Sequence, residues 1–522
     1  MKVITAAQAA AMIESGKTIA LSGSAGTSLL ADSVLEALED RYLTTGTPRD
    51  LTIFHPQGVG DKNVMGISRL AHKGLCRKVI GGHWGMSPKM GQLAVEEAIE
   101  AYNLPQGVMA QMMRSMAANG PGVITKIGLG TYIDPRQECG RMNKSAKDSL
   151  VEVIELDGEE WLRYKPVPID IAILRGTTAD ADGYISLEEE VHYDEVVAMA
   201  GAAKNNGGIV IVQVKNLAKA DSIPCAKVKI PGYLVDYVVV CPDQRQSIDY
   251  FYRPSYCGAV KEPVTLKWPD NVLNERKFIA RRQAMELRPG MLVNIGVGVS
   301  NGVPLILSEE GVWDQITLSL EQGQSGGIPV MGIDAGTMLN PRVILEHPTQ
   351  HDLYHGGILD ATCLSAAETD FNGNVNVSKL GKSLTGCGGF IDISSETKRI
   401  VFGGTLCAKS KVSFEGGKVT VLEQGTIRKF VNKVQQITFS GERAKQLKKY
   451  VVFITERCVF KLEPEGLTLI EIAPGIDLER DILAVMDYRP LISKDLKEMP
   501  RELFNPGPMG LKETWAKLRT DV

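Results

Sequence analysis

The sequence predicts an α/β fold made of two homologous, mostly parallel domains. Helical spacing of apolar residues alternates with short apolar runs, and we expect helices at Leu29–Leu38, Ala94–Tyr102 and Glu275–Leu287. At 522 residues the chain is longer than one hydrophobic core usually supports, so it should divide into domains. An internal repeat indicates that two of these domains share one fold.

Three pairs of segments carry the repeat. The first is a glycine followed by an apolar strand, and the second is an apolar strand that runs into a glycine. The third places an Asp-x-(Asp/Asn)-Gly turn between two extended segments. In order, the pairs are Gly16–Leu21 with Gly290–Ile295, Leu51–Gly58 with Ile316–Gly323, and Asp170–Ser186 with Asp360–Asn376. The first copy is longer between the second and third segments, which predicts an insertion within 61–167.

The segment between the two copies has the composition of a linker. It contains Pro242, Pro254, Pro263 and Pro269 among mixed polar residues, and proline opposes both helix interiors and central strands. We therefore expect one domain at 1–240, a linker at 241–273 and a homologous domain at 274–522.

Composition and charge argue against several classes of protein. The net charge is −4 and no basic tract occurs, so nucleic acid is not an expected partner. The first residues lack the basic start and apolar core of an export signal, and no later run is apolar for long enough to span a bilayer. We therefore expect a cytoplasmic protein with no membrane partner. Nine cysteines without a Cys-x-x-Cys pair favour reduced thiols over disulfides or a zinc site.

Three histidines, His347, His351 and His355, recur every four residues. Because Pro348 and two following glycines oppose a helix, we expect a polar loop there and assign no metal ligand. A metal site at these histidines is the less favoured alternative.

The segment Gln315–Pro329 places Glu321 where a predicted strand gives way to a glycine-rich loop. Large apolar and small polar side chains alternate from Ile316 to Leu320, which predicts a buried strand. Ligands of α/β proteins usually bind at strand ends, and glycines let a ligand approach the backbone closely. Glu321 is therefore a candidate nucleophile, although a solvated turn is the more common place for a glutamate before glycine.

Two glycine motifs are open to more than one interpretation. Gly296–Gly302 resembles a dinucleotide-binding loop whose third glycine is one position late, and its amides could hold phosphate or simply form a tight turn. Gly323–Gly327 matches the Gly-x-Ser-x-Gly turn of serine hydrolases, with Ser325 as nucleophile. That turn leads directly into a helix, whereas Pro329 and Gly332 oppose a helix here.

A third glycine loop, Gly386–Gly389, runs into an apolar stretch. Backbone amides exposed by such a loop can stabilise an oxyanion during acyl transfer. Cys387 lies within the loop, but no basic residue close in sequence would make it a thiolate. We therefore rank Cys387 below Glu321 as a nucleophile.

The duplicated chain, the Glu-x-Gly-x-x-Gly-Gly-Ile-Pro loop at Glu321 and the Gly-x-Gly-Gly-Phe loop at Gly386 together resemble the family I coenzyme A transferases. More narrowly, they are similar to the single-chain acetate/propionate type. The resemblance covers nearly the whole chain and includes Gly81–Gly85, Lys126–Pro135, Ile230–Tyr237, Ile454–Arg457 and Ile470–Asp477.

This resemblance implies that Glu321 attacks an acyl-CoA and becomes a glutamyl-CoA thioester. It also implies which groups surround the thioester and its oxyanions, namely the amides of Gly388 and Gly389 and the loop residues Gly296, Gly298 and Ser300.

The loop departs from the family where it borders the acyl pocket. Gln322 is larger than the usual small residue there, and Ser325 belongs to a pair that is usually more apolar. Gln57 aligns with Gln322 in the first copy of the repeat, so all three are candidate acyl-pocket residues.

The expected function is a ping-pong CoA-transferase for short-chain acids of the acetate, propionate and butyrate class. Acyl-CoA hydrolysis through the same Glu321 is the alternative, because water could resolve the thioester. The resemblance implies acyl-CoA and carboxylic acids as substrates, no tightly bound cofactor, and a homo-oligomer, either a dimer or a tetramer.

Overall fold

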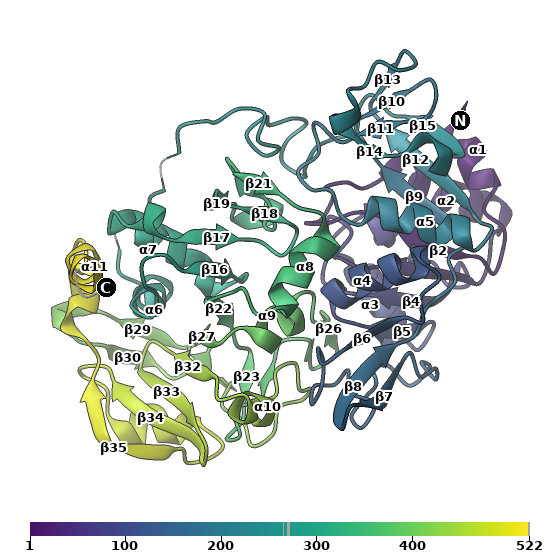
Figure 1. Cartoon of the computed structure of the whole chain (residues 1–522). Helices are drawn as coiled ribbons and strands as arrows, with labels where there is room; N and C mark the ends of the chain where they lie inside the picture. The colour runs from purple at the N-terminus through teal and green to yellow at the C-terminus, as the bar shows by residue number, and fades with distance from the viewer. Residues whose placement is uncertain (265, 269–271, 520–522) are drawn as a thin grey trace. The chain divides into compact units, whose positions relative to one another are not determined.

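The computed structural model describes residues 1–264, 266–268 and 272–519 (Figure 1). By its internal contacts the chain forms two units. Unit 1 comprises Met1–Glu262, Leu320–Leu353 and Gly381–Asp392, and unit 2 comprises Pro263–Ser319, Tyr354–Leu380 and Ile393–Val522. Two segments of the second predicted domain thus belong to unit 1. The predicted boundary between the repeats, at 241–273, stays a prediction, and its Pro269 lies outside the described residues.

Unit 1 is built on an eight-stranded sheet in which every neighbouring pair is parallel. Its central strands are continuous apolar runs, because helices cover both faces of such a sheet. Across the sheet the strands are β1 (Lys2–Ile4), β15 (Tyr237–Val240), β12 (Ile209–Val214), β9 (Ile171–Arg175), β2 (Thr18–Leu21), β3 (Leu51–His55), β4 (Cys76–Gly81) and β5 (Glu100–Asn103).

Two pairs of helices in unit 1 pack together, α4 against α5 and α1 against α2 (Figure 1). The helices of unit 1 are α1 (Ala6–Ala11), α2 (Asp32–Thr45), α3 (Pro88–Val95), α4 (Gln106–Ala117) and α5 (Val196–Asn205). Smaller sheets contain β6 (Val123–Thr125), β8 (Glu159–Tyr164) and β7 (Val151–Leu156), and β13 (Asn216–Ala218), β10 (Thr178–Asp180), β11 (Ile185–Ser186) and β14 (Val228–Ile230). From the second half of the chain, unit 1 also contains β18 (Gln324–Ser325), β21 (Val343–Ile344), β19 (Ile328–Pro329), β20 (Met338–Leu339) and β26 (Ser383–Leu384).

Unit 2 holds strands of a second large, mostly parallel sheet. Neighbours are parallel from β17 to β32, whereas β33 is antiparallel to both of its neighbours. In order they are β17 (Thr317–Ser319), β16 (Leu292–Ile295), β22 (Ala361–Ser365), β27 (Arg399–Gly403), β32 (Tyr450–Ile454), β33 (Cys458–Glu463), β34 (Gly466–Ile472) and β35 (Leu491–Glu498).

The helices of unit 2 include α6, whose first turn is capped by the Asn274 side chain. The helices are α6 (Glu275–Ala284), α7 (Val303–Glu309), α10 (Gly441–Gln446) and α11 (Leu511–Arg519). Shorter strands are β23 (Glu368–Thr369), β24 (Val375–Asn376), β25 (Lys379–Leu380), β28 (Cys407–Ala408), β31 (Ile427–Arg428), β29 (Lys411–Ser413) and β30 (Thr420–Glu423). Two helices, α8 (His347–His355) and α9 (Phe390–Glu396), contain residues of both units.

The two units repeat one arrangement of four strands, β12-β9-β2-β3 in unit 1 and β27-β22-β16-β17 in unit 2. In each copy an aspartate at the equivalent position makes the same hydrogen bond to the strand β2 or β16. Asp170 Oδ2 accepts from the Thr18 amide at 2.8 Å, and Asp360 Oδ2 accepts from the Leu292 amide at 2.8 Å. The prediction of two mostly parallel α/β parts is therefore confirmed.

The Asp-x-(Asp/Asn)-Gly turns also match between the copies. Asp180 Oδ1 accepts from the amide two residues on, at 3.0 Å, and Asp370 Oδ1 does the same at 3.0 Å. Each turn then uses a glycine with positive φ, 90° at Gly183 and 79° at Gly373, where a residue with a Cβ would be strained.

The helix prediction at Ala94–Tyr102 is wrong. Helix α3 lies earlier and ends at Val95, Glu97 takes a left-handed φ of 58°, and β5 begins at Glu100. Tyr102 is buried within the parallel sheet. Periodicity does not separate a short helix from a strand that is buried on both faces. The other two predicted helices overlap α2 and α6.

The loop prediction at His347 is also wrong, since His347–His355 forms helix α8. Pro348 is the second residue of this helix, where a missing amide hydrogen leaves no helical hydrogen bond unmade. The amide of His347, the first residue of the helix, donates to the Asp194 carbonyl at 3.1 Å.

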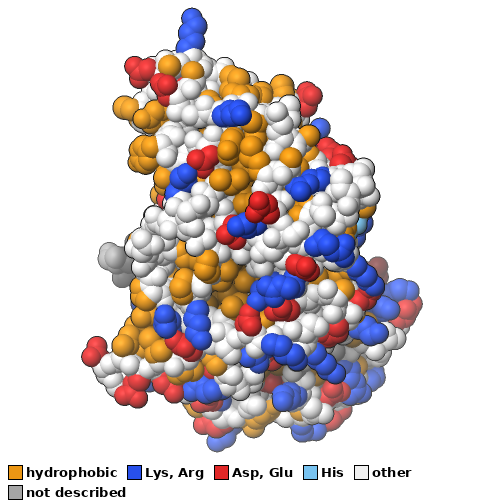
Figure 2. Space-filling view, turned by 90° about the vertical axis from the view of Figure 1, so that its right-hand side faces the viewer, with side chains coloured by type: hydrophobic (Ala, Val, Ile, Leu, Met, Phe, Trp, Pro, Cys, Tyr) orange, Lys and Arg blue, Asp and Glu red, His pale blue; other side chains and the backbone are white. Residues whose placement is uncertain are grey.

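Acidic and basic side chains are interspersed over the face shown in Figure 2, in keeping with the small net charge. Within the described residues, no helix combines the length and apolarity needed to cross a bilayer. All nine cysteines are free thiols, and most of them are buried.

Candidate active site

The candidate site lies within unit 1, at the carboxyl ends of β4 and β5. Asn103, the last residue of β5, joins these ends to the glycine loop that precedes α9. Its Nδ2 donates to the carbonyls of Gly81 and Gly82, each at 2.6 Å, and its Oδ1 accepts from the Cys387 amide at 2.9 Å. Ligands of α/β proteins usually bind at the carboxyl ends of parallel strands, and this site lies at such ends. The same principle singled out Glu321 in the sequence.

Backbone hydrogen bonds fix the glycine loop on both sides of Cys387. The Trp84 amide donates to the Thr385 carbonyl at 2.7 Å, and the Gly388 amide donates to the Gly82 carbonyl at 2.8 Å. The Gln106 amide then donates to the Gly388 carbonyl at 3.1 Å. The amide of Gly388 therefore already donates a hydrogen bond within the protein.

Glu321 is half-buried and its carboxylate lies directly against the backbone of Gly389. A Cβ built on Gly389 would be 1.9 Å from Glu321 Oε2, so only glycine allows this contact. On the other side, Gln322 Nε2 donates to Glu321 Oε1 at 3.1 Å. The loop after Glu321 needs its glycines, since φ is 108° at Gly323 and 80° at Gly326.

Burial raises the pKa of Glu321 to about 7, and the negative charge of Asp392 adds to this effect. The side chains of Gln322 and Gln106 oppose it by favouring the ionised carboxylate. Asp392 itself accepts from the amides of Gly107 at 3.1 Å and Val108 at 3.3 Å, at the start of α4. A carboxyl group with such a pKa is ionised in part near neutral pH and is less solvated than a surface glutamate, so it can act as a nucleophile.

The other candidate nucleophiles fit less well. Burial raises the pKa of the Cys387 thiol far above its usual range, so the thiolate is disfavoured. Ser325 belongs to β18, and the next element along the chain is the strand β19 instead of a helix. The serine-hydrolase turn is therefore excluded by the local structure.

The predicted loop Gly296–Gly302 belongs to unit 2. Gly298 takes a φ of 113°, and the Ser300 side chain is buried, its Oγ accepting from Gln283 Nε2 at 3.0 Å. Pro304 falls within the first turn of α7, where proline is tolerated. Any ligand at this loop would meet backbone rather than the Ser300 hydroxyl.

Gln57 is buried in unit 1, and its Nε2 donates to Asp194 Oδ1 at 2.9 Å.

Sequence patterns assigned no role to three residues that the fold brings to the site, namely Gln106, Asn103 and Asp392. A signal for two of them existed, because Asn103 ends a parallel strand and Gln106 begins the next helix.

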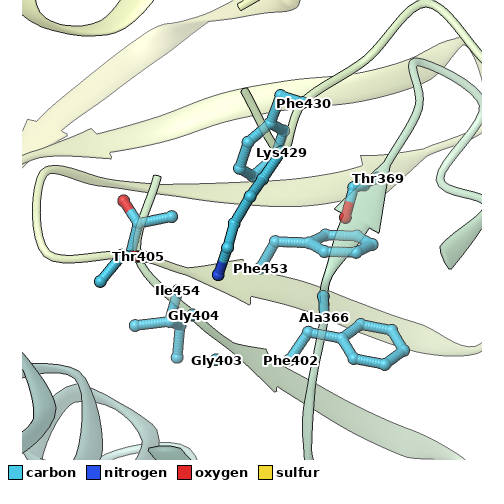
Figure 3. Close-up of a pocket in the computed structure, with 11 residues that line it drawn as sticks. Ala366, Thr369, Phe402, Gly403, Gly404, Thr405, Lys429, Phe430, Phe453 and Ile454 are labelled. Carbon is cyan, nitrogen blue, oxygen red and sulfur yellow. The ribbon is translucent and has the colours of Figure 1, made fainter. Parts of the chain in front are cut away.

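Unit 2 contains a separate hollow at the carboxyl ends of β27 and β32 (Figure 3). Gly403, Gly404 and Thr405 form one wall, and Phe402, Phe430 and Phe453 supply apolar surface. The ammonium group of Lys429 points into the hollow and lies over Gly404. It has no hydrogen-bond or ion-pair partner in the part of the chain that the structure describes, and burial lowers its pKa. An anionic ligand in the hollow would favour the charged form of this amine.

We compared the chain with known proteins. A protein-family model described as "Coenzyme A transferase" matches residues 3–241. The chain is 44% identical over 514 residues to acetate CoA-transferase YdiF of Escherichia coli, covering 97% of this chain and 96% of that protein. It is 44% identical over 524 residues to caffeate CoA-transferase of Acetobacterium woodii, covering 99% and 100%. A crystal structure of Escherichia coli acyl-CoA transferase YdiF as a thioester complex with CoA has 43% identity and a TM-score of 0.92, covering 98% of this chain and 97% of that one.

Proposed function

The chain belongs to the coenzyme A transferases, and from this premise we propose that it moves CoA between a short-chain acyl-CoA and a free carboxylic acid through Glu321. The observation that carries the proposal is the Glu321 carboxylate, half-buried against the Gly389 backbone with its pKa raised to about 7. Acyl-CoA and CoA are substrates in this proposal, and no tightly bound cofactor is needed.

The proposed chemistry proceeds by two half-reactions. A Glu321 carboxylate oxygen attacks the acyl-CoA carbonyl, the C–S bond breaks, and CoA leaves as a thiolate from an acyl-glutamyl anhydride. The thiolate then attacks the Glu321 carbonyl and expels the first acid as its carboxylate, leaving a glutamyl-CoA thioester. A second carboxylate repeats these steps in reverse and leaves as the new acyl-CoA. No net proton transfer is required, so an acid–base histidine is not needed.

Each addition step develops an oxyanion, which hydrogen-bond donors stabilise strongly in a site that excludes water. The amide of Gly389 supports this role because no partner for it occurs among the described residues. The amide of Gly388 is used by Gly82, so within this pair we assign the oxyanion donor to Gly389. Gly296, Gly298 and Ser300 remain proposed contacts of the CoA moiety, through their backbone atoms, because the Ser300 hydroxyl is buried beside Gln283.

We propose that the accepted acids belong to the acetate, propionate and butyrate class. Two relatives with the same 44% identity carry the names of different acids, acetate and caffeate, so overall likeness does not fix this choice. We propose that Gln322, Ser325 and Gln57 influence it as acyl-pocket residues. For Gln322 the hydrogen bond to Glu321 adds a second role, which is to orient the nucleophile.

Transfer and hydrolysis are distinguished by omitting the acceptor. We expect acetyl-CoA consumption to be fast with propionate and to stop after about one equivalent per active site without it, because water should resolve the glutamyl thioester slowly. Free thiol and propionyl-CoA are measured together by chromatography. Equal rates of acetyl-CoA loss with and without propionate would favour the hydrolase alternative.

The raised pKa of Glu321 gives a pH prediction. The rate of CoA attachment to the enzyme from acetyl-CoA should rise with pH and level off above a midpoint near 7, because only the ionised carboxylate attacks. Asp392→Asn should move this midpoint to lower pH, since it removes a charge that disfavours ionisation of Glu321. Rapid-quench mass spectrometry across pH 5 to 9 checks both, and an unchanged midpoint in the variant would contradict the role given to Asp392.

We further propose that the protein acts in the cytoplasm as a homo-oligomer, either a dimer or a tetramer. Membership of the family supports the homo-oligomer. Light scattering on the purified protein measures the number of subunits.

A further inference from the structure

The Gly81–Gly85 segment, which contains His83, has no role in the proposed chemistry although it lies in the active site. His83 follows the carboxyl end of β4, the strand whose last carbonyl receives a hydrogen bond from Asn103. Its side chain is half-buried. The segment is fixed from both sides, because the Gly82 amide donates to the His55 carbonyl at 3.0 Å and the Trp84 amide donates to the Thr385 carbonyl at 2.7 Å.

Glycine backbone surrounds the imidazole ring. A Cβ on Gly58 would lie 2.9 Å from His83 Nδ1, and one on Gly85 would lie 2.8 Å from His83 Cε1. These distances are shorter than any normal carbon contact, so both positions have to be glycine for the ring to stay where it is. The third wall is Gly388, where a Cβ would be 3.4 Å from His83 Cδ2.

Gly388 and Gly389 place His83 beside the nucleophile. These adjacent residues contact the imidazole and the Glu321 carboxylate, respectively, and the side chain of Gln106 approaches both of them. The three side chains therefore face one short stretch of the loop. A substrate whose reacting carbon meets Glu321 presents its oxygens within this group.

The ring of His83 has hydrogen-bonding capacity that the protein does not use. Neither nitrogen has a hydrogen-bond partner within residues 1–264, 266–268 and 272–519. Burial lowers the pKa of His83 to about 4, and the neighbouring His55 and Lys62 add to this effect. The ring is then neutral near pH 7, with one N–H to donate and no charge that would hold Glu321 in an ion pair.

We propose that His83 is a further catalytic residue, which donates a hydrogen bond to the carboxylate oxygen of the acid substrate as that acid approaches the glutamyl thioester. The same donor meets the carbonyl oxygen of the acyl-CoA in the reverse direction. This inference rests on the proposed function, since it assumes that the acid reacts at Glu321. The ligand group is the carboxylate that all acid substrates share, and not the acyl chain.

The test compares His83→Leu, which removes the donor, with His83→Gln, which restores one. We expect His83→Leu to raise the KM for acetate by about tenfold to a hundredfold, because the lost bond is to a charged group, and to raise the KM for acetyl-CoA less, because a carbonyl is neutral. The factor should be the same for acetate, propionate and butyrate. His83→Gln should recover part of the loss, and both variants should melt at the wild-type temperature.

Three outcomes would overturn the role of His83. These are an unchanged KM for acetate in His83→Leu, a loss that depends on the length of the acyl chain, and a His83→Gln variant no better than His83→Leu. Attachment of CoA to Glu321 in the wild-type enzyme is measured in parallel by mass spectrometry. If that adduct is missing, the proposed function itself fails; if it forms while the KM values do not change, only the role of His83 fails.

Discussion

Glu321→Gln is expected to abolish CoA transfer, lowering kcat by about 10⁴-fold or more, as loss of a covalent nucleophile does in other enzymes. Glutamine keeps the shape of the side chain and can still pair with Gln322, which now donates to Glu321 at 3.1 Å. What it lacks is a carboxylate oxygen that attacks the thioester. Transfer of CoA from acetyl-CoA to propionate, measured at saturating substrates, gives the size of the loss.

The covalent intermediate provides the control for this prediction. After incubation with acetyl-CoA, the wild-type peptide that contains Glu321 should carry CoA, and the peptide of Glu321→Gln should not. Ser325→Ala and Cys387→Ser should keep the adduct on Glu321. An adduct on Ser325 or Cys387 in the wild-type protein would defeat the mechanism.

Stability should separate lost chemistry from lost structure. The pKa of Glu321 is raised from 4.5 to about 7 in the folded protein, so the native state binds this proton more tightly than the unfolded chain. Stability is therefore lost as pH rises from about 4.5 through 7. The amide introduced by Glu321→Gln does not titrate, so this variant should melt at or above the wild-type temperature at pH 8, with little difference at pH 4. A lower melting temperature at pH 8 would indicate structural damage.

The parts of the fold that were predicted correctly depend on local sequence. Apolar runs mark β2, β16 and β17, and the Asp-x-(Asp/Asn)-Gly turns recur because Asp180 and Asp370 each accept the same hydrogen bond from the amide two residues on. Two predictions were wrong, also for reasons of local sequence. Pro348 opposes a helix only if it lies beyond the first turn, and the pattern of Ala94–Tyr102 suits either a helix or a buried strand.

The candidate site was predictable only in part, because its residues come from distant segments. Glu321 and the glycine loop each carry a pattern of their own. Gln106 and Asp392 are separated widely in sequence, and their role depends on the contact between the Asp392 carboxylate and the amides of Gly107 and Val108. No periodicity reports such a contact. The repeat itself was informative for Glu321, since Pro56 occupies the equivalent position in the first copy.

Gly389→Ala is the second substitution with a large expected effect. The added Cβ would be 1.9 Å from Glu321 Oε2 and 2.8 Å from Glu321 Cδ, so the carboxylate has to leave its present position. Displacing a reacting group by about 1 Å can cost about 10²-fold in rate. We expect kcat to fall by at least this factor. The backbone of Gly389 does not have a positive φ, so alanine fits its conformation and the fold should remain.

Gly388→Ala is the matched control, because this substitution introduces backbone strain and no close steric contact, the opposite of Gly389→Ala. Gly388 has a φ of 52°, where alanine is strained by about 1 kcal/mol. A Cβ at this position would meet nothing closer than 3.4 Å. Gly388→Ala should therefore lower the melting temperature slightly while most of the activity remains.

The pair distinguishes steric contact with the nucleophile from general damage to the glycine loop. Should the loop matter only for its backbone conformation, Gly388→Ala would be the more harmful change, because it alone introduces strain. Should the loop matter because Glu321 lies on it, Gly389→Ala would lose activity and keep its stability. Rates of CoA attachment and thermal unfolding, measured on both variants, decide between these cases. Gly389→Ala with near wild-type attachment of CoA to Glu321 would mean that the carboxylate does not react from the position it occupies in this structure.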